Sequence, residues 1–446
     1  MKNGGKGEIL IRELASEELH NVRKIRVYLP PSYRETGTRR YPVLYMHDGQ
    51  NVFSGSGGMF GGSWEVDLAA ERLFGEGVIE EIIIVGIDNN AERSDEYCHV
   101  APAKFSAGRM GLRDYEKEKH PKGLLYEHFL IHTVKPYIDK NFRTLADREN
   151  TALMGSSLGG LVTYFIGLRN PSVFGKLGIV SPAFHWLDFE NLPKLSAYPE
   201  RIWMDAGEGE AHYIENARRV INDLVRQGMK PGENLAYYQV PGAIHNEKSW
   251  RERVHMPLIY LFGSLDSPLS CRLPGRRVFG LKGMSYRQIT PELCFANNLR
   301  MTALFGEYRV EDESVMRVDP SGAVSPITTG QTKVKFTCDG CTAEEEYRVI
   351  EELSDMVEIR LKVLVPKTQE TIYVSQCGVH ALQREADGTY SHTFTVPRDW
   401  GFPITIMRGE KHIAEADVHT GRFKNRVIFA TESKKIVFRV EAWMQQ

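Results

Sequence analysis

One short motif has the residue types and spacing of an activated serine. Residues 155–159 form the only G-x-S-x-G match in the chain, and they stand between an apolar run, Thr151–Met154, and a helix-like stretch, Leu161–Leu168. A sharp turn from a strand into a helix exposes the central serine, and glycines flank it because a Cβ there would clash. The pattern predicts Ser157 as a nucleophile.

Such a serine needs a base, and the base needs an acid that holds it in the right tautomer. In chains that use this turn the acid follows the serine and the histidine comes last. His245 is the predicted base, because it lies just past Leu235–Val240, the last strand expected in the sheet. His212 opens a predicted helix and His185 is expected to line a pocket or pack in a loop. The histidines after the serine are His185, His212, His245 and His255.

The acid should follow the predicted strand Ile202–Met204, where Asp205, Glu208 and Glu210 are all candidates. Glu210 is the preferred acid because it lies in the loop beyond the strand and can reach a histidine on the neighbouring loop. Asp205 can still lie within the strand, pointing into or across the sheet. The choice among the three carboxylates stays open at this point.

A tetrahedral intermediate needs two backbone N–H donors. The residue after the nucleophile, Leu158, supplies one. The other is predicted to be the N–H of Gln50, in the sharp turn Asp48–Asn51 that follows the apolar strand Tyr41–His47.

The elements around these residues predict an α/β fold. Over the first ~268 residues apolar strands alternate with amphipathic helices, which indicates a mostly parallel sheet covered on both faces. After Pro268 short alternating runs between Gly, Asp and Ser turns are typical of all-β structure. We expect three domains, an α/β domain over 1–268 and two β-sandwiches over 272–352 and 354–446.

Composition narrows the functional classes. The chain has 446 residues, 42% hydrophobic and 26% charged, with a formal net charge of −2, so we expect no nucleic-acid partner and no membrane association. No signal segment is visible, and a cytoplasmic location is the expectation. Six cysteines are too few for a disulfide scaffold. Cys338-Asp-Gly-Cys341 is a lone C-x-x-C, and a turn between strands is favoured over a metal or redox site.

Three segments together resemble the Putative esterase family of α/β-hydrolases, which includes esterase D-like, feruloyl-esterase-like and enterochelin-esterase-like enzymes. They are YPVLYMHDGQNVF at 41–53, MGSSLGG at 154–160 and GAIHNE at 242–247, and the resemblance covers about residues 8–265. It implies a Ser/acid/His triad that hydrolyses carboxylic esters without a metal or cofactor.

Carried over by position, the resemblance makes Ser157 the nucleophile, His245 the base and Glu210 the acid, with Gln50 and Leu158 as oxyanion donors. It also places Arg93, Phe184 and Trp186 where related enzymes line the acyl or alcohol pocket, although Trp186 can equally be a packing residue. The substrate it implies is a small-molecule or carbohydrate ester.

The two later regions resemble β-modules. Residues 308–336 are similar to a bacterial Ig-like repeat, and the last ~90 residues are similar to a starch-binding-type sandwich. That module usually has an aromatic after its Arg-Gly pair, where this chain has Glu410-Lys-His412, although Trp400 and Tyr390 could offer an aromatic face. Packing or homo-oligomerisation is therefore expected of this module in preference to glycan binding.

Two other functions fit the same residues. An acyltransferase would use the same triad and pass the acyl group to an acceptor other than water. A carbohydrate-binding or scaffold protein would have a hydrolase domain without activity, against which the intact Ser157 motif and His245 argue. A serine esterase is the leading prediction.

Overall fold

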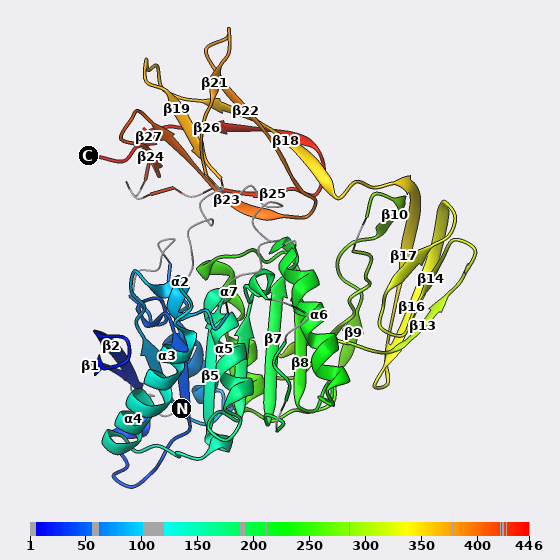
Figure 1. Ribbon diagram of the computed structural model, residues 1–446. Coiled ribbons are helices and arrows are strands. Elements are labelled where there is room, and N and C mark those ends of the chain that lie inside the picture. Colours follow the sequence, from blue (N-terminus) through cyan, green and yellow to red (C-terminus); the bar gives the residue numbers. More distant parts are fainter. Residues whose placement is uncertain are drawn as a thin grey trace.

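A computed structural model provides the structure of the chain. It describes residues 6–55, 62–100, 120–187, 189, 192–195, 197–210, 212–284, 286–376, 378–419, 421, 423–424 and 426–445. An α/β region comes first, and two β-rich regions follow it along the chain (Figure 1). This confirms the predicted fold class.

The first region is built on one eight-stranded sheet with the order β1-β2-β4-β3-β5-β6-β7-β8. Strands β3 to β8 are parallel to one another. β2 pairs antiparallel with β4, and β1 pairs antiparallel with β2. The central strands are buried along their whole length, as expected of strands covered on both faces. The strands are β1 (Glu8–Ser16), β2 (Asn21–Leu29), β3 (Val43–His47), β4 (Ile83–Ile87), β5 (Thr151–Ser156), β6 (Lys176–Val180), β7 (Arg201–Gly207) and β8 (Leu235–Val240).

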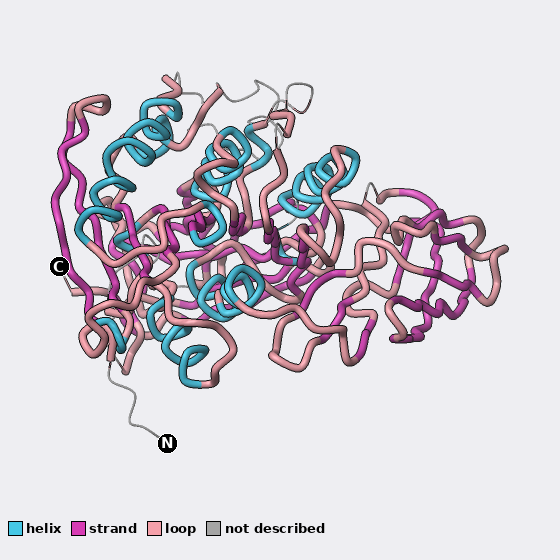
Figure 2. Tube along the Cα trace, turned by 90° about the horizontal axis from the view of Figure 1, so that it is seen from below, coloured by secondary structure: helices cyan, strands magenta, loops and turns pink. Residues whose placement is uncertain are grey.

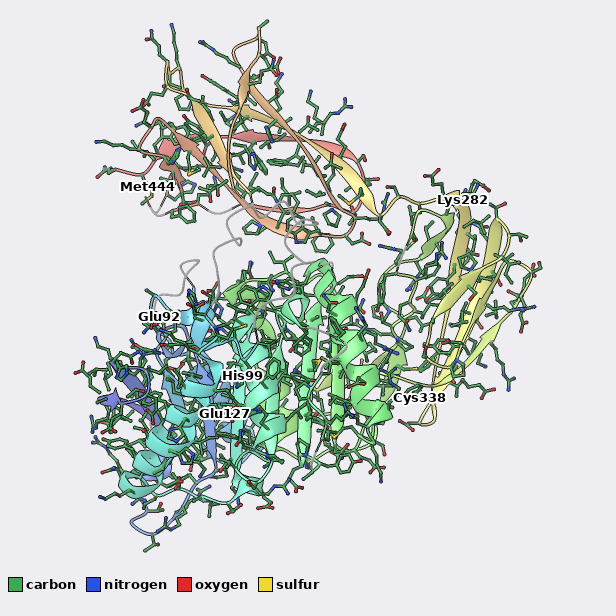
Figure 3. All side chains as sticks on the ribbon, in the orientation of Figure 1. Glu92, His99, Glu127, Lys282, Cys338 and Met444 are labelled. Carbon is green, nitrogen blue, oxygen red and sulfur yellow. The ribbon has the colours of Figure 1, made fainter. Side chains whose placement is uncertain are left out.

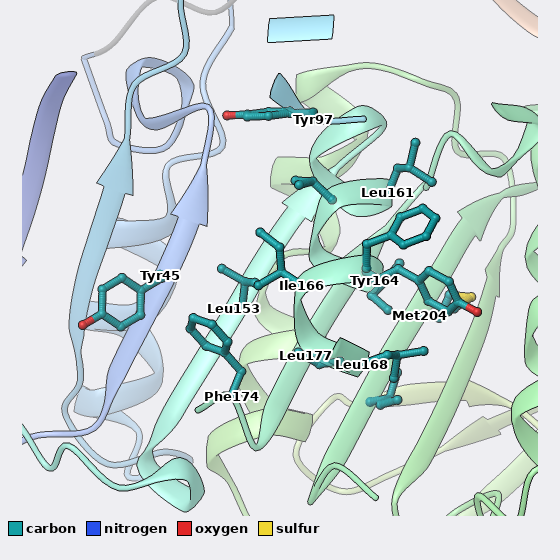
Figure 4. Close-up of a cluster of buried hydrophobic side chains, with 14 of the residues drawn as sticks. Tyr45, Tyr97, Leu153, Leu161, Tyr164, Ile166, Leu168, Phe174, Leu177 and Met204 are labelled. Carbon is teal, nitrogen blue, oxygen red and sulfur yellow. The ribbon is translucent and has the colours of Figure 1, made fainter. Parts of the chain in front are cut away.

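Helices lie on both sides of these strands (Figure 2). One buried cluster joins the sheet to α3, α4, α5 and α6, and a second joins it to α1, α7 and α8. Figure 4 shows Leu161, Tyr164 and Leu168 of α5 in the first cluster. The helices are α1 (Val66–Gly75), α2 (Arg93–Glu96), α3 (Gly123–Phe129), α4 (Lys135–Asn141), α5 (Leu158–Arg169), α6 (His212–Arg226), α7 (Glu247–Arg253) and α8 (His255–Phe262), with a π-helical turn, η4 (Leu130–Val134), between α3 and α4.

Short 3₁₀ turns at the ends of strands carry several of the predicted site residues. Among the described residues they are η1 (Pro31–Tyr33), η2 (Gly49–Asn51), η5 (Arg148–Asn150), η6 (Phe184–Trp186) and η7 (Glu208–Glu210). Three of them, η2, η6 and η7, follow the carboxyl ends of β3, β6 and β7. Ligand sites of open parallel sheets lie at this edge.

The second region consists of three small sheets that share a core with the first. Their orders are β10-β17-β16-β13, β12-β11-β9 and β14-β15. Buried residues of this region belong to the same cluster as residues of the eight-stranded sheet. The strands are β9 (Ser270–Arg272), β10 (Val278–Lys282), β11 (Glu292–Cys294), β12 (Arg300–Thr302), β13 (Glu307–Val310), β14 (Met316–Val318), β15 (Val324–Pro326), β16 (Gly330–Cys338) and β17 (Cys341–Glu352).

The C-x-x-C motif closes the hairpin between β16 and β17. Cys338 pairs with Cys341, and the two residues between them have φ of 48° and 79°, the left-handed values of a tight hairpin turn. Cys338 lies at the opposite end of this region from Lys282 (Figure 3). Within the described part of the chain no group of three or more His, Cys, Asp or Glu side chains is arranged to hold a metal ion.

The third region is a separate pair of sheets with its own core. The orders are β21-β22-β18-β26 and β20-β19-β23-β24-β27, with β25 paired to β23. Its buried cluster contains residues of this region alone. The strands are β18 (Met356–Leu364), β19 (Ile372–Ser375), β20 (Val379–Ala381), β21 (Gln383–Arg384), β22 (Tyr390–Pro397), β23 (Gly401–Arg408), β24 (Ile413–Ala416), β25 (Arg426–Phe429), β26 (Lys434–Arg439) and β27 (Ala442–Trp443).

None of the helices in the described ranges is long and apolar enough to cross a membrane.

Candidate active site

Ser157 lies in a strained turn between β5 and α5. Its φ and ψ are 58° and −121°, a left-handed φ that costs energy for a non-glycine residue. A Cβ on Gly155 would lie 2.7 Å from the carbonyl oxygen of Gly159, and a Cβ on Gly159 would lie 3.3 Å from Asp48 Oδ2. Gly155 is therefore needed for close packing, as the sequence pattern predicts, and a side chain at position 159 would press against Asp48.

His245 lies in the loop between β8 and α7, next to the serine. Its Nε2 is 3.0 Å from Ser157 Oγ, and its Nδ1 is 3.2 Å from Glu210 Oε2. Its ring packs against Tyr213, with centroids 4.4 Å apart, and edge-on against Trp250 at 5.1 Å. The loop ends where the Asn246 side chain accepts a hydrogen bond from the N–H of Ser249 and so begins α7.

Of the three carboxylates left open by the sequence, Glu210 is the one beside His245. Glu208 Oε2 accepts the N–H of Gly242 at 3.0 Å, and Asp205 lies buried within β7. Burial would raise the pKa of Glu210, but its hydrogen bond to His245 and the nearby charge of Arg253 lower it below its usual value. Glu210 is therefore held as a carboxylate.

A buried polar network lies behind Glu210, and the sequence does not reveal it. Ser181 Oγ donates to Glu210 Oε1 at 2.7 Å and accepts from Arg253 Nη2 at 2.6 Å and Trp250 Nε1 at 3.1 Å. Arg253 also donates to Asp205 at 2.9 Å. Burial raises the pKa of Asp205 although Arg253 offsets part of that effect. Asp205 thus holds the arginine rather than the histidine.

Trp250 and Arg253 lie three residues apart on α7, a spacing that places them on the same face of the helix. Both side chains are buried, yet the helix that carries them contains five charged residues in seven, EKSWRER. Such a composition predicts a solvated helix, and for that reason the sequence does not distinguish the buried arginine from its neighbours.

The predicted oxyanion donors follow the carboxyl ends of two neighbouring parallel strands, β5 and β3. Leu158 is the first residue of α5, where backbone N–H groups have no acceptor within the helix. Gln50 is the middle residue of η2, and the turn is held by Asp48, whose φ is 59°. The Asp48 carboxylate accepts two hydrogen bonds from Arg93, at 2.6 and 2.8 Å.

Arg93 therefore braces the turn that carries Gln50. Burial would raise the pKa of Asp48, but the charge and hydrogen bonds of Arg93 lower it. The guanidinium of Arg93 is paired with the Asp48 carboxylate. The predicted contact of Arg93 with substrate stays a prediction. Sequence reasoning missed Asp48 as its partner, although the two residues lie in segments that both belong to the family resemblance.

The two predicted aromatic pocket residues are buried in η6. Phe184 is 0% exposed and packs edge-on against Tyr164, and Trp186 is 4% exposed. Their burial favours a packing role, and a direct substrate contact stays a prediction. His185, between them, packs edge-on against Tyr213 at 5.1 Å, which places it near the His245 ring but not in the hydrogen-bonded chain with Ser157.

The remaining histidine candidates lie elsewhere. His212 begins α6, as predicted. His255 begins α8, and burial lowers its pKa to about 4. The arrangement as a whole joins a hydroxyl, an imidazole and a carboxylate through two consecutive hydrogen bonds. This arrangement suits acyl transfer through a serine.

Comparisons with known proteins agree on the first region. The family model described as "Putative esterase" matches residues 16–261. The chain is 26% identical over 268 residues to the uncharacterized protein YbbA of Bacillus subtilis (strain 168), covering 57% of this chain and 98% of that protein. It is 29% identical over 242 residues to an endo-1,4-beta-xylanase/feruloyl esterase of Xylanibacter ruminicola, covering 53% of this chain and 29% of that protein. Among solved structures, the ferulic acid esterase AmCE1/Fae1A of Anaeromyces mucronatus is 21% identical, with 59% of this chain and 91% of that chain covered and a TM-score of 0.41.

Proposed function

We propose that this chain, which belongs to the Putative esterase family and is a carboxylic ester hydrolase, cleaves its substrate with a catalytic triad of Ser157, His245 and Glu210. The observation that carries the proposal is the continuous hydrogen-bonded chain from the serine hydroxyl through the imidazole to the buried carboxylate, with distances of 3.0 and 3.2 Å. The lowered pKa of Glu210 supports its role, because an ionised carboxylate stabilises the imidazolium that forms during the reaction.

In the first half of the reaction Ser157 Oγ attacks the ester carbonyl carbon while His245 Nε2 takes the hydroxyl proton. The carbonyl π electrons move to oxygen, and the N–H groups of Leu158 and Gln50 hold that oxyanion. When the oxyanion collapses, the C–O bond to the alcohol breaks and His245 gives its proton to the leaving alkoxide. The product is an alcohol and an acyl-serine.

In the second half a water molecule takes the place of the alcohol. His245 removes a proton from the water as its oxygen attacks the acyl carbon, and the proton then returns to Ser157 Oγ as the acyl–serine bond breaks. The carboxylic acid leaves and the free serine is restored. Glu210 keeps His245 Nδ1 protonated throughout, so that Nε2 can accept.

We propose acyl esters as the substrate class, including acyl esters of carbohydrates. The name of the Xylanibacter ruminicola relative, which includes a feruloyl esterase, supports this choice. The two β-rich regions that follow the esterase region are compatible with it.

The first test is hydrolysis of p-nitrophenyl esters from acetyl to octanoyl, together with methyl ferulate. We expect turnover by the wild type, and a loss of at least about 10⁴-fold in kcat/KM for Ser157→Ala with the fold retained. Ser156→Ala is the matched control, because Ser156 is the preceding serine, buried at the end of β5. Equal activity of Ser157→Ala and wild type would overturn the proposal.

The choice of acid is tested in the same assay. Glu210→Gln should lower kcat by about 10³–10⁴-fold, the effect of replacing a triad acid by its amide. Glu208→Gln should change kcat no more than a few-fold, because Glu208 bonds to the Gly242 N–H and not to His245. The opposite ranking would assign the acid to Glu208.

A further inference from the structure

The loops that carry Glu210 and His245 are joined to each other. The N–H of Gly209 donates to the carbonyl of Ala243 at 2.9 Å, and the N–H of Gly242 donates to Glu208 Oε2 at 3.0 Å. These bonds connect the residues just before the acid with the residues just before the histidine. Movement of one loop therefore shifts the other, and with it the placement of Glu210 and His245 relative to Ser157.

The third region of the chain packs directly on this pair of loops. A Cβ on Gly209 would lie 2.5 Å from Phe429 Cε2, at the end of β25, and 2.9 Å from Ile244 Cγ2. A Cβ on Gly401, the first residue of β23, would lie 2.0 Å from Ile244 Cγ2. Figure 1 shows β23 and β25 as the strands of this region nearest the α/β domain. The contact is so tight that a methyl group added to Gly209 or Gly401 would force a neighbouring side chain to move.

Charged groups surround the apolar contact and connect all three regions. Asp399, in the turn before β23, forms an ion pair with Arg276 of the second region. Glu208 lies next to this pair, since a Cβ on Gly275 would be 3.0 Å from its Oε1. Burial raises the pKa of Glu208, and the charge of Asp399 adds to that effect while Arg276 opposes it. The acid loop is thus the point where the three regions meet.

We propose that the third region, residues 354–446, is a positioning element of the active site, which holds the Glu210 and His245 loops in place through Phe429 and Gly401. This inference rests on the proposed triad. Catalytic groups must be held within a few tenths of an ångström, and a shift of about 1 Å can cost about 100-fold in rate. The triad loops lie at the open edge of the sheet, and the sandwich supplies the packing that a loop there lacks.

Phe429→Ala in the full chain tests the proposal by removing the contact. The matched control is Phe438→Ala. Phe438 is an aromatic residue of the same region, and the Cζ of Arg426 lies over its ring, 4.5 Å from the ring centroid. We expect kcat on p-nitrophenyl acetate to fall about tenfold in Phe429→Ala with KM within twofold, since misplaced triad loops slow the reaction more than they weaken binding. The control should keep wild-type kcat.

Two further variants separate positioning from general damage. Phe429→Leu keeps an apolar side chain at the contact and should restore most of kcat. Gly401→Ala overfills it, because the added methyl would meet Ile244, and should lower kcat as Phe429→Ala does. Equal kcat in Phe429→Ala and wild type, or equal losses in Phe429→Ala and Phe438→Ala, would overturn the proposal.

Hydrogen exchange gives a readout that does not depend on ester turnover. Phe429→Ala should speed exchange of the amides of residues 207–210 and 242–245, and Phe438→Ala should not. Unchanged exchange in Phe429→Ala would overturn the positioning role even if the wild type hydrolyses none of the esters. Lack of turnover by a wild type whose Ser157 also fails to react with a fluorophosphonate would instead count against the proposed triad.

Discussion

The two β-rich regions join the α/β domain in different ways. The second region shares a buried cluster with it, and polar contacts reinforce the junction: Tyr238 of β8 donates to the buried Glu292 at 2.8 Å, and the N–H of Gln239 donates to Thr302 Oγ1 at 2.9 Å. The third region keeps a closed core of its own, and among the described residues it contacts the α/β domain at the two loops that carry Glu210 and His245.

The difference separates stability from catalysis. A shared core couples the unfolding of the first two regions, because opening either one exposes apolar surface of both. A region with a closed core can move or dock without exposing that core. The second region therefore stabilises the α/β domain, and the third is suited to act on the site it contacts.

The largest expected effect comes from a cavity in the shared cluster. Leu299 is fully buried there, and Leu299→Ala should lower the free energy of unfolding by about 2–5 kcal/mol. Esterase activity measured after heating identifies which calorimetric transition unfolds the α/β domain. That transition should move to lower temperature in Leu299→Ala. Ile404→Ala makes a comparable cavity in the third region's core and should leave that transition in place. A scan in which the two variants lower it equally would contradict the comparison.

A smaller effect is expected at the polar junction of the first two regions. Tyr238→Phe removes the hydroxyl that donates to the buried Glu292, and should cost about 1.5–3 kcal/mol of unfolding free energy in urea. The control is Tyr237→Phe on the same strand, because the Tyr237 hydroxyl is buried without a hydrogen-bond partner among the described atoms. That change should be neutral or stabilising. If both variants unfold at the same urea concentration, the junction contributes less than the structure indicates.

The smallest effect concerns Glu208, where the third region meets the acid loop. Its folded pKa is raised by burial and by Asp399, so the folded state binds more protons than the unfolded state as the pH rises above the ordinary range of a glutamate. Stability therefore falls with rising pH through this window. Glu208→Gln should flatten that slope in thermal melts recorded at pH values above the ordinary pKa of a glutamate. An unchanged slope would show that Glu208 is not the group responsible.

Residues with a local signature were predictable from the sequence. The turn around Ser157 has one because Gly155 is needed for close packing, and His245 follows from the order of strands. The mostly parallel sheet and the later β-rich regions were also predicted and are confirmed. For Ser157 the signal is a pattern within about ten residues, whereas His245 and the sheet follow from the order of strand-like and helix-like segments along the chain.

Residues defined by distant contacts were not predictable. Arg253 lies in a helix of mostly charged residues, and its burial depends on Asp205 and Ser181 from two other strands. The sequence predicts a domain boundary at about residue 270, but the first two regions share one buried cluster across it. Alternation of apolar residues shows which face of a strand is buried but not which part of the chain covers it.

The shared cluster also matters while the chain is being synthesised. The α/β domain is complete by about residue 262, the end of α8, yet residues that share its buried cluster and pack against its β8 edge, from Leu273 to Val349, emerge later. Until then the nascent domain leaves the ribosome with apolar surface still open to water, a state prone to association with other chains. Folding of the α/β domain on the ribosome thus stays incomplete until synthesis has passed the second region, whereas the third region can fold afterwards as an independent unit.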